Sequence, residues 1–163
     1  MALPAFLASA ADSWSAYYGD HRMVSVTVRA LHLGGLALGG GTALAVDRKM
    51  LSSLRKGGVA REAGLADLDG SHRVVLPALA LVVLTGLLMT ASDSATFLSS
   101  RLYWAKLGLV ALLLLNGSGL LAAERAAKRG RAAGWSWLAV VSGLSFVLWL
   151  VIVYVGVWLT AAA

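Results

Sequence analysis

Four long runs of apolar residues, separated by short polar stretches, dominate the pattern along this chain. They cover about residues 24–46, 74–90, 102–123 and 137–160. An α-helix needs about 20 apolar residues to cross the hydrocarbon core of a bilayer. The second run, which is the shortest, has to stand upright or take in flanking residues. The pattern therefore predicts an all-α integral membrane protein, a four-helix bundle that forms one domain over residues 1–163.

The polar stretches between the runs carry most of the positive charge. Of the 14 Lys and Arg residues, ten lie in two segments, residues 47–73 and 124–136. Positive residues favour the cytoplasmic side of a membrane. We therefore expect these segments to be cytoplasmic loops, the first with one short helical turn, and both termini to lie outside. This bias accounts for the net charge of +6, so the lipid bilayer is the expected partner and nucleic acid is not.

The residues ahead of the first run form a separate pattern. Apolar side chains recur there at helical spacing: Leu3, Phe6, Leu7, Ala10, Trp14 and Tyr17. This spacing predicts a short amphipathic helix that lies on the outer surface of the membrane. Its Trp and Tyr side chains also suit docking against a partner subunit.

Small and polar residues inside the runs indicate how the helices pack. Gly35 and Gly39 are four residues apart in the first run, and such glycines let helix backbones approach closely in a membrane. Asn116 lies in the middle of the third run, where we expect it to form a hydrogen bond to a neighbouring helix.

Acidic residues avoid the apolar runs. Asp47 follows the first run beside Arg48 and Lys49, and we interpret it as part of a solvated boundary, with Arg73 or His72 as its candidate partner. His72 itself is expected to be surface-exposed. Without buried acids, a proton-driven transporter is not predicted. The chain has no Cys, which excludes disulfides, thiolate ligands and iron–sulfur clusters.

The position of His32 inside the first apolar run requires an explanation, because histidine near a bilayer interior is costly and rare. It lies one helical turn after Arg29, on the same face of the helix. At about 1.5 Å of rise per residue, His32 lies roughly 12 Å and Lys106 roughly 6 Å inside the outer end of the bundle. Arg101 and Met89 fall near this level. The outer half is therefore predicted to gather these five residues around one pocket, whereas His72 belongs to the opposite end.

A b-type haem is one ligand that such a pocket suits. His32 would be the axial metal ligand, Met89 a conceivable second one, and Arg29, Arg101 or Lys106 could meet the propionates. A bis-His haem is not available within one chain at this depth. Two simpler interpretations stay open: His32 could form only a hydrogen bond between helices, and the Lys106 ammonium could extend to the membrane surface.

Residues from three of the runs carry a family resemblance. The motifs are Arg29-Ala30-Leu31-His32, then Pro77 and the pair Thr85-Gly86, then Trp104-Ala105-Lys106-Leu107. In this order they resemble the four-helix bacterial protoporphyrinogen oxidase family and the related copper-resistance D-type membrane proteins. The resemblance implies a bacterial inner-membrane protein that binds haem b, and it singles out His32 and Lys106, with Arg29 in place of the family's usual Lys.

The chain departs from this family directly after the first run. It reads Val46-Asp47-Arg48-Lys49-Met50, where the oxidases have a Pro-Arg and aromatic-rich segment. This ending is similar to that of a sister group with an Asp-x-Arg sequence. The resemblance therefore implies haem binding more strongly than protoporphyrinogen oxidation.

Three functions follow as hypotheses. The first is a small inner-membrane haem-binding protein with a redox or haem-related role, alone or as a subunit of a larger complex. The second is an accessory membrane subunit without a cofactor, which packs against other subunits or against copies of itself. The third is copper handling, with His32 and Met89 as ligands. The sequence does not decide whether the protein is an enzyme.

Overall fold

The structure is a computed structural model that describes residues 5–161, and every element in that range is helical. In chain order the elements are α1 (Ala5–Asp20), α2 (Arg22–Gly35), the π-helical turn η1 (Leu36–Gly40), α3 (Gly41–Lys56), α4 (Val59–Ser92), α5 (Ser94–Ser99), α6 (Arg101–Lys128) and α7 (Ala132–Ala161). Four stretches are long and apolar enough to cross a bilayer: the continuous path through α2, η1 and α3, then α4, α6 and α7. The predicted all-α membrane bundle with four spanning helices is confirmed.

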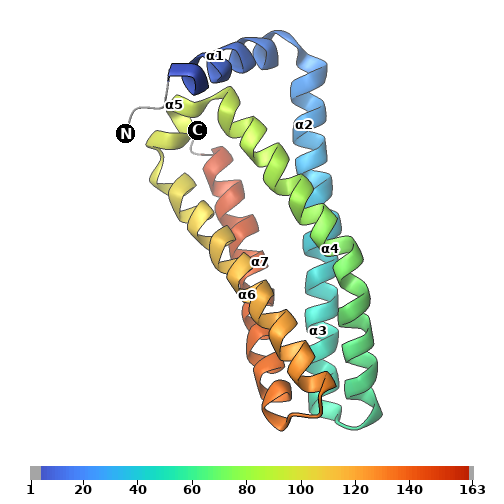
Figure 1. Ribbon diagram of the computed structural model, residues 1–163. Coiled ribbons are helices and arrows are strands. Elements are labelled where there is room, and N and C mark those ends of the chain that lie inside the picture. The colour runs from blue at the N-terminus through green and yellow to red at the C-terminus, as the bar shows by residue number, and fades with distance from the viewer. Residues whose placement is uncertain (1–4, 162–163) are drawn as a thin grey trace.

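The spanning helices contact one another in a row. α4 packs against α2, η1 and α3, α3 packs against α7, and α7 packs against α6. α4 and α6 stand next to each other in Figure 1, but their backbones make few close approaches. The side between α4 and α6, the open side, is therefore the most loosely packed side of the bundle.

The segment predicted as the first loop is almost entirely helical. α3 continues to Lys56 and α4 begins at Val59, so only Gly57 and Gly58 separate them. These glycines have φ of +73° and +51°, a region that side chains disfavour and glycine enters freely. The prediction of a loop over residues 47–73 is wrong, because charged residues end a lipid-facing surface without ending a helix: Ala, Leu, Lys and Arg are all good helix formers.

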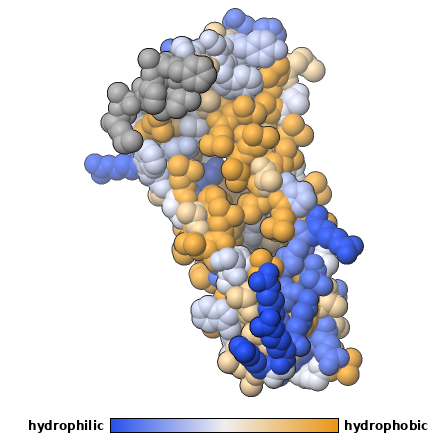
Figure 2. All heavy atoms as spheres, viewed as in Figure 1, coloured by the Kyte–Doolittle hydropathy of each residue, from blue (hydrophilic) through white to orange (hydrophobic). Residues whose placement is uncertain are grey.

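The second predicted loop is also much shorter than expected. α6 ends at Lys128 and α7 begins at Ala132, which leaves residues 129–131 as the connection instead of residues 124–136. Gly130, with φ of +73°, makes the turn. Figure 2 shows hydrophilic side chains gathered over this lower end of the bundle, where both helical extensions lie, and a largely hydrophobic face above them.

The helical extensions are held by a core of their own. Its buried members come from α3, α4, α6 and α7: Met50, Leu65, Leu68, Leu120, Ala123, Ala127, Leu138 and Val141. Because apolar surface leaves water when these side chains pack, the extensions are stable parts of the bundle rather than loose connections.

α1 lies across the other end of the bundle, over the end of α4 (Figure 1). The Trp14 indole N–H donates to the Leu88 carbonyl at 2.8 Å, and the Ser15 hydroxyl donates to the Ser92 carbonyl at 2.7 Å. The predicted short helix is therefore present and tied to α4. Of the residues that predicted it, Leu3 and the side chains of Phe6 and Leu7 lie outside the described part of the chain.

The small and polar residues of the spans make the predicted packing contacts. A Cβ atom built on Gly35 would lie 2.8 Å from Val82 Cγ2, and one on Gly39 would lie 2.9 Å from Ala78 Cβ. Both glycines are thus required by the close approach of the first span to α4. Asn116 donates from Nδ2 to the Val141 carbonyl on α7 at 2.9 Å, which confirms its expected interhelical bond.

Candidate functional site

His32 lies on α2 and faces α4. Its Nδ1 is 3.0 Å from the hydroxyl oxygen of Thr85, a residue 53 positions away in the sequence. The ring rests against Gly86, where an added Cβ would lie 3.3 Å from His32 Cε1. The interhelical hydrogen bond that was one interpretation of His32 is therefore present, and the absence of a side chain at Gly86 makes room for the ring.

The direction of this hydrogen bond decides which ring nitrogen remains for a ligand. The Thr85 hydroxyl lies 2.6 Å from the Leu81 carbonyl oxygen and donates its single proton there. It must then accept from His32, so Nδ1 carries the ring proton. A neutral imidazole has one N–H, so Nε2 keeps its lone pair. Metal-binding histidines are oriented in this way by a partner on the other nitrogen.

Lys106 brings a positive charge to the same region from α6. Its side chain is half-buried, and a Cβ built on Gly156 of α7 would lie 3.3 Å from Nζ. Its ammonium is near enough to act electrostatically on His32. Among the described side chains, no carboxylate lies within ion-pair distance of Lys106. The arrangement joins a lone-pair donor with an uncompensated cation.

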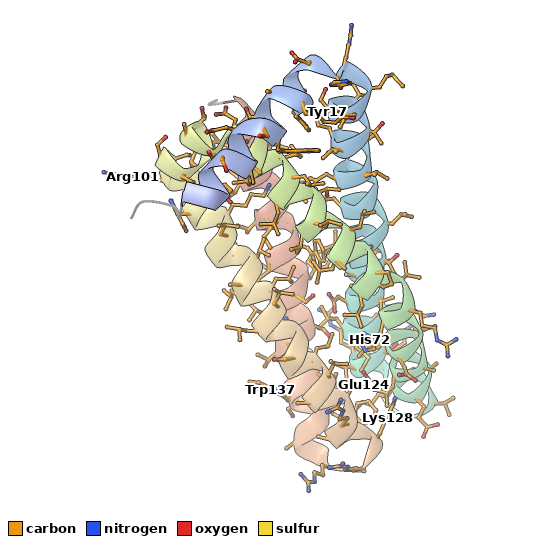
Figure 3. All side chains as sticks on the ribbon, turned by 45° about the horizontal axis from the view of Figure 1, so that its top comes forward. Tyr17, His72, Arg101, Glu124, Lys128 and Trp137 are labelled. Atoms are coloured by element: carbon orange, nitrogen blue, oxygen red, sulfur yellow. The ribbon has the colours of Figure 1, made fainter. Side chains whose placement is uncertain are left out.

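The other predicted site residues are less closely associated with His32. Met89 is half-buried on α4, one turn beyond Thr85 and on the same side of that helix. Arg29 is exposed on α2. Arg101 is exposed at the start of α6 and points away from the bundle in Figure 3. The structure thus leaves Lys106 within electrostatic range of His32 and both arginines on the surface.

Two buried acids were missed by the sequence reasoning. Asp47 is only 2% exposed and Glu124 only 4% exposed, so the interpretation of Asp47 as part of a solvated boundary was wrong. Asp47 does not pair with Arg73 or His72, but faces the hydroxyls of Ser142 and Ser145 on α7. Both acids continue the buried stripe of their helix into the charged extension, and helical spacing from Met50 or Leu120 would have revealed them.

Glu124 is the centre of an ion-pair network between α4 and α6. Its Oε2 lies 3.0 Å from His72 Nε2, and its Oε1 lies 2.7 Å from Lys128 Nζ. Lys128 also reaches Asp69 on α4 at 3.4 Å. Figure 3 shows His72, Glu124 and Lys128 beside one another between the two helices. His72, expected to be surface-exposed, instead helps to join α4 to α6 at this end.

Within the described residues, no cluster of three or more His, Cys, Asp or Glu side chains is placed to hold a metal ion. Comparisons with models of protein families, with curated proteins and with solved structures found no match for the chain. The site therefore has to be interpreted from its own residues.

Proposed function

We propose that this chain is a multi-pass protein of a bacterial inner membrane that binds a b-type haem through His32. The observation that carries the proposal is the pairing of an oriented imidazole with an unpaired ammonium. Thr85 fixes the His32 ring through Nδ1, and Nε2 is the nitrogen left to bind iron. Lys106 supplies a cation for a propionate.

The residues fit this cofactor in their chemistry. Imidazole is a common axial ligand of haem iron, and thioether sulfur is a common second ligand, a role that Met89 could fill from α4. A half-buried ammonium without a protein carboxylate is costly in a membrane, and an anionic propionate would offset that cost. When bound, haem would supply one-electron redox chemistry. The chain's own part is to orient the ligand, neutralise the propionate and limit water.

The convergence of the three motifs adds support. His32 contacts Thr85 and Gly86, and Lys106 lies within electrostatic range of His32, so motif residues from three different spans lie in the same region of the bundle. The proposal does not extend to protoporphyrinogen oxidation. The chain departs from the oxidase pattern at Asp47, a buried residue in the other half of the bundle.

An absorption spectrum tests the proposal. Protein purified in mild detergent from haem-replete cells should show a Soret band that His32→Ala abolishes. His21→Ala is the matched control, because His21 is exposed and stacks on Tyr17 at 4.1 Å between ring centroids. Thr85→Val should weaken haem binding by about 10- to 100-fold, as the loss of a ligand's orienting partner does. A colourless wild-type protein, or an unchanged Soret band in His32→Ala, would refute the proposal. Bound copper in a metal analysis would then favour copper handling, whereas co-purified membrane subunits would favour an accessory role.

A further inference from the structure

The open side of the bundle is bounded at both ends by side-chain contacts between α4 and α6. At one end His72 pairs with Glu124 at 3.0 Å. At the other, the Thr90 hydroxyl lies 3.1 Å from the Tyr103 hydroxyl. The backbones of the two helices make few close approaches, and residues of both line a cavity between these ends. The open side is therefore a lateral window in the wall of the bundle.

A cavity of about 270 Å³ occupies the half of this window nearer to His72. Leu76 of α4 and Leu114 of α6 line it and are 55% and 49% exposed, so they form its rim. Trp149 of α7, only 3% exposed, forms part of its inner wall. Since the rim belongs to two membrane-spanning helices, the mouth opens towards lipid rather than towards water.

The inner wall also carries an unsatisfied acceptor. Asp47 lines the cavity and is 2% exposed. Ser142 and Ser145 act on its carboxyl group as hydrogen-bonding neighbours, whereas the second oxygen, Asp47 Oδ2, has no partner in hydrogen-bond geometry among the described residues. A buried polar atom without a partner costs roughly 1–3 kcal/mol. Apolar cavities with a few converging polar groups are typical of ligand sites.

We propose that this window binds a membrane-soluble phenol, the chemical class that includes hydroquinones. The phenol O–H donates to Asp47 Oδ2, the ring lies by Trp149, and an apolar tail leaves between Leu76 and Leu114 into the lipid. The carboxylate selects a donor over an ether or a carboxylic anion. Entry from the hydrocarbon core selects a neutral molecule over an ammonium, and the small volume admits one ring rather than a whole phospholipid. The proposal does not depend on a haem at His32.

Equilibrium binding to the full chain in nanodiscs tests this assignment. The probes are para-octylphenol, its methyl ether para-octylanisole, which lacks the donor, and decanol, which lacks the ring. We expect saturable binding of the phenol, and binding of the ether and the alcohol weaker by about tenfold, the loss typical of a hydrogen bond to a charged group. Asp47→Asn should weaken the phenol by a similar factor and leave the ether unchanged.

A cavity-filling variant gives a second arm. Gly117 of α6 lines the cavity, and nothing lies within 4 Å of an added Cβ. Gly117→Leu should block the phenol, whereas Gly108→Leu, at an exposed and equally open position of the same helix, should not. Thermal unfolding checks that each variant is folded. If the phenol and its methyl ether bind equally well, the cavity is filled by apolar contact alone and the proposal is overturned. If decanol binds as well as the phenol, the choice of a phenol is overturned. If no probe binds saturably, the proposal fails and water is the partner of Asp47.

Discussion

The contact between Gly39 and Ala78 sets the spacing between the first span and α4. A Cβ atom on Gly39 would lie 2.9 Å from Ala78 Cβ, and the next nearest atoms are 3.8 Å away. An ordinary van der Waals contact needs at least 3.4 Å. Neither Cβ belongs to a flexible side chain, so Gly39→Ala can be accommodated only by moving backbone. His32 lies seven residues earlier on the same helical path and reaches Thr85 across this interface.

Overpacking of this kind costs about 1–3 kcal/mol, whereas the higher helix propensity of Ala returns about 1 kcal/mol. We therefore expect Gly39→Ala to lower the free energy of unfolding by up to about 2 kcal/mol. Gly34→Ala is the matched control on α2, because nothing lies within 4 Å of its added Cβ. That variant should be as stable as the wild type or more so. Circular dichroism during titration with denaturing detergent measures both values.

A double-mutant cycle makes the reasoning refutable. Ala78→Gly removes the atom that clashes with the added Cβ, so the combined variant, in which one helical glycine replaces another at no net cost in helix propensity, should regain the lost stability. The coupling between the two sites is expected to be favourable by about 1–3 kcal/mol. Additive effects, or equal stabilities of Gly39→Ala and Gly34→Ala, would show that the interface is not as tight as the 2.9 Å contact requires.

Two further predictions concern charged residues. Glu124→Gln should lower the free energy of unfolding by about 1–3 kcal/mol, because it leaves His72 beside a weaker partner. The control is Glu62→Gln, on the exposed face of α4, which should change the free energy of unfolding by less than about 0.5 kcal/mol. Equal losses in the two variants would contradict a stabilising network around Glu124. Lys106→Met keeps the apolar stem and removes the charge, so the cofactor-free protein should gain about 1 kcal/mol or more while haem binding weakens. An unchanged free energy of unfolding would mean instead that the ammonium reaches water at the membrane surface.

The spanning helices could be predicted because the bilayer imposes a length on apolar segments. Hydropathy reports where lipid ends, however, and not where a helix ends. Hydropathy therefore predicts loops where the charged extensions are helical. The better signal for the turn is Gly57-Gly58, the only pair of adjacent glycines between residues 47 and 73. The interhelical role of Asn116 followed from its depth alone, since a polar amide in hydrocarbon has to find a partner.

The site was predicted in part for a different reason. Depth along the membrane normal places His32 and Lys106 at similar levels, and by the same criterion it also predicts Arg29 and Arg101 as site residues. Depth does not say which way a side chain faces, and both arginines are exposed. Asp47 was missed because a carboxylate after an apolar run resembles a solvated boundary. Its position three residues before Met50 on one helical stripe was the better guide.

Two charged groups of this bundle lie beside α7 without an oppositely charged partner among the described residues. An inward-facing polar group normally finds a partner on a neighbouring helix, as Asn116 does on α7. Lys106 lies beside Gly156 and Asp47 beside Ser142 and Ser145, and α7 carries no charged side chain that could pair with either of them. Lys106 is left without a carboxylate in one half, and Asp47 Oδ2 is left without a donor in the other. Each unpaired group is a cost of a few kcal/mol against a typical fold stability of 5–15 kcal/mol. Because leucine at both positions would avoid that cost, the unpaired charges favour ligands at these two places over a purely structural role for this bundle.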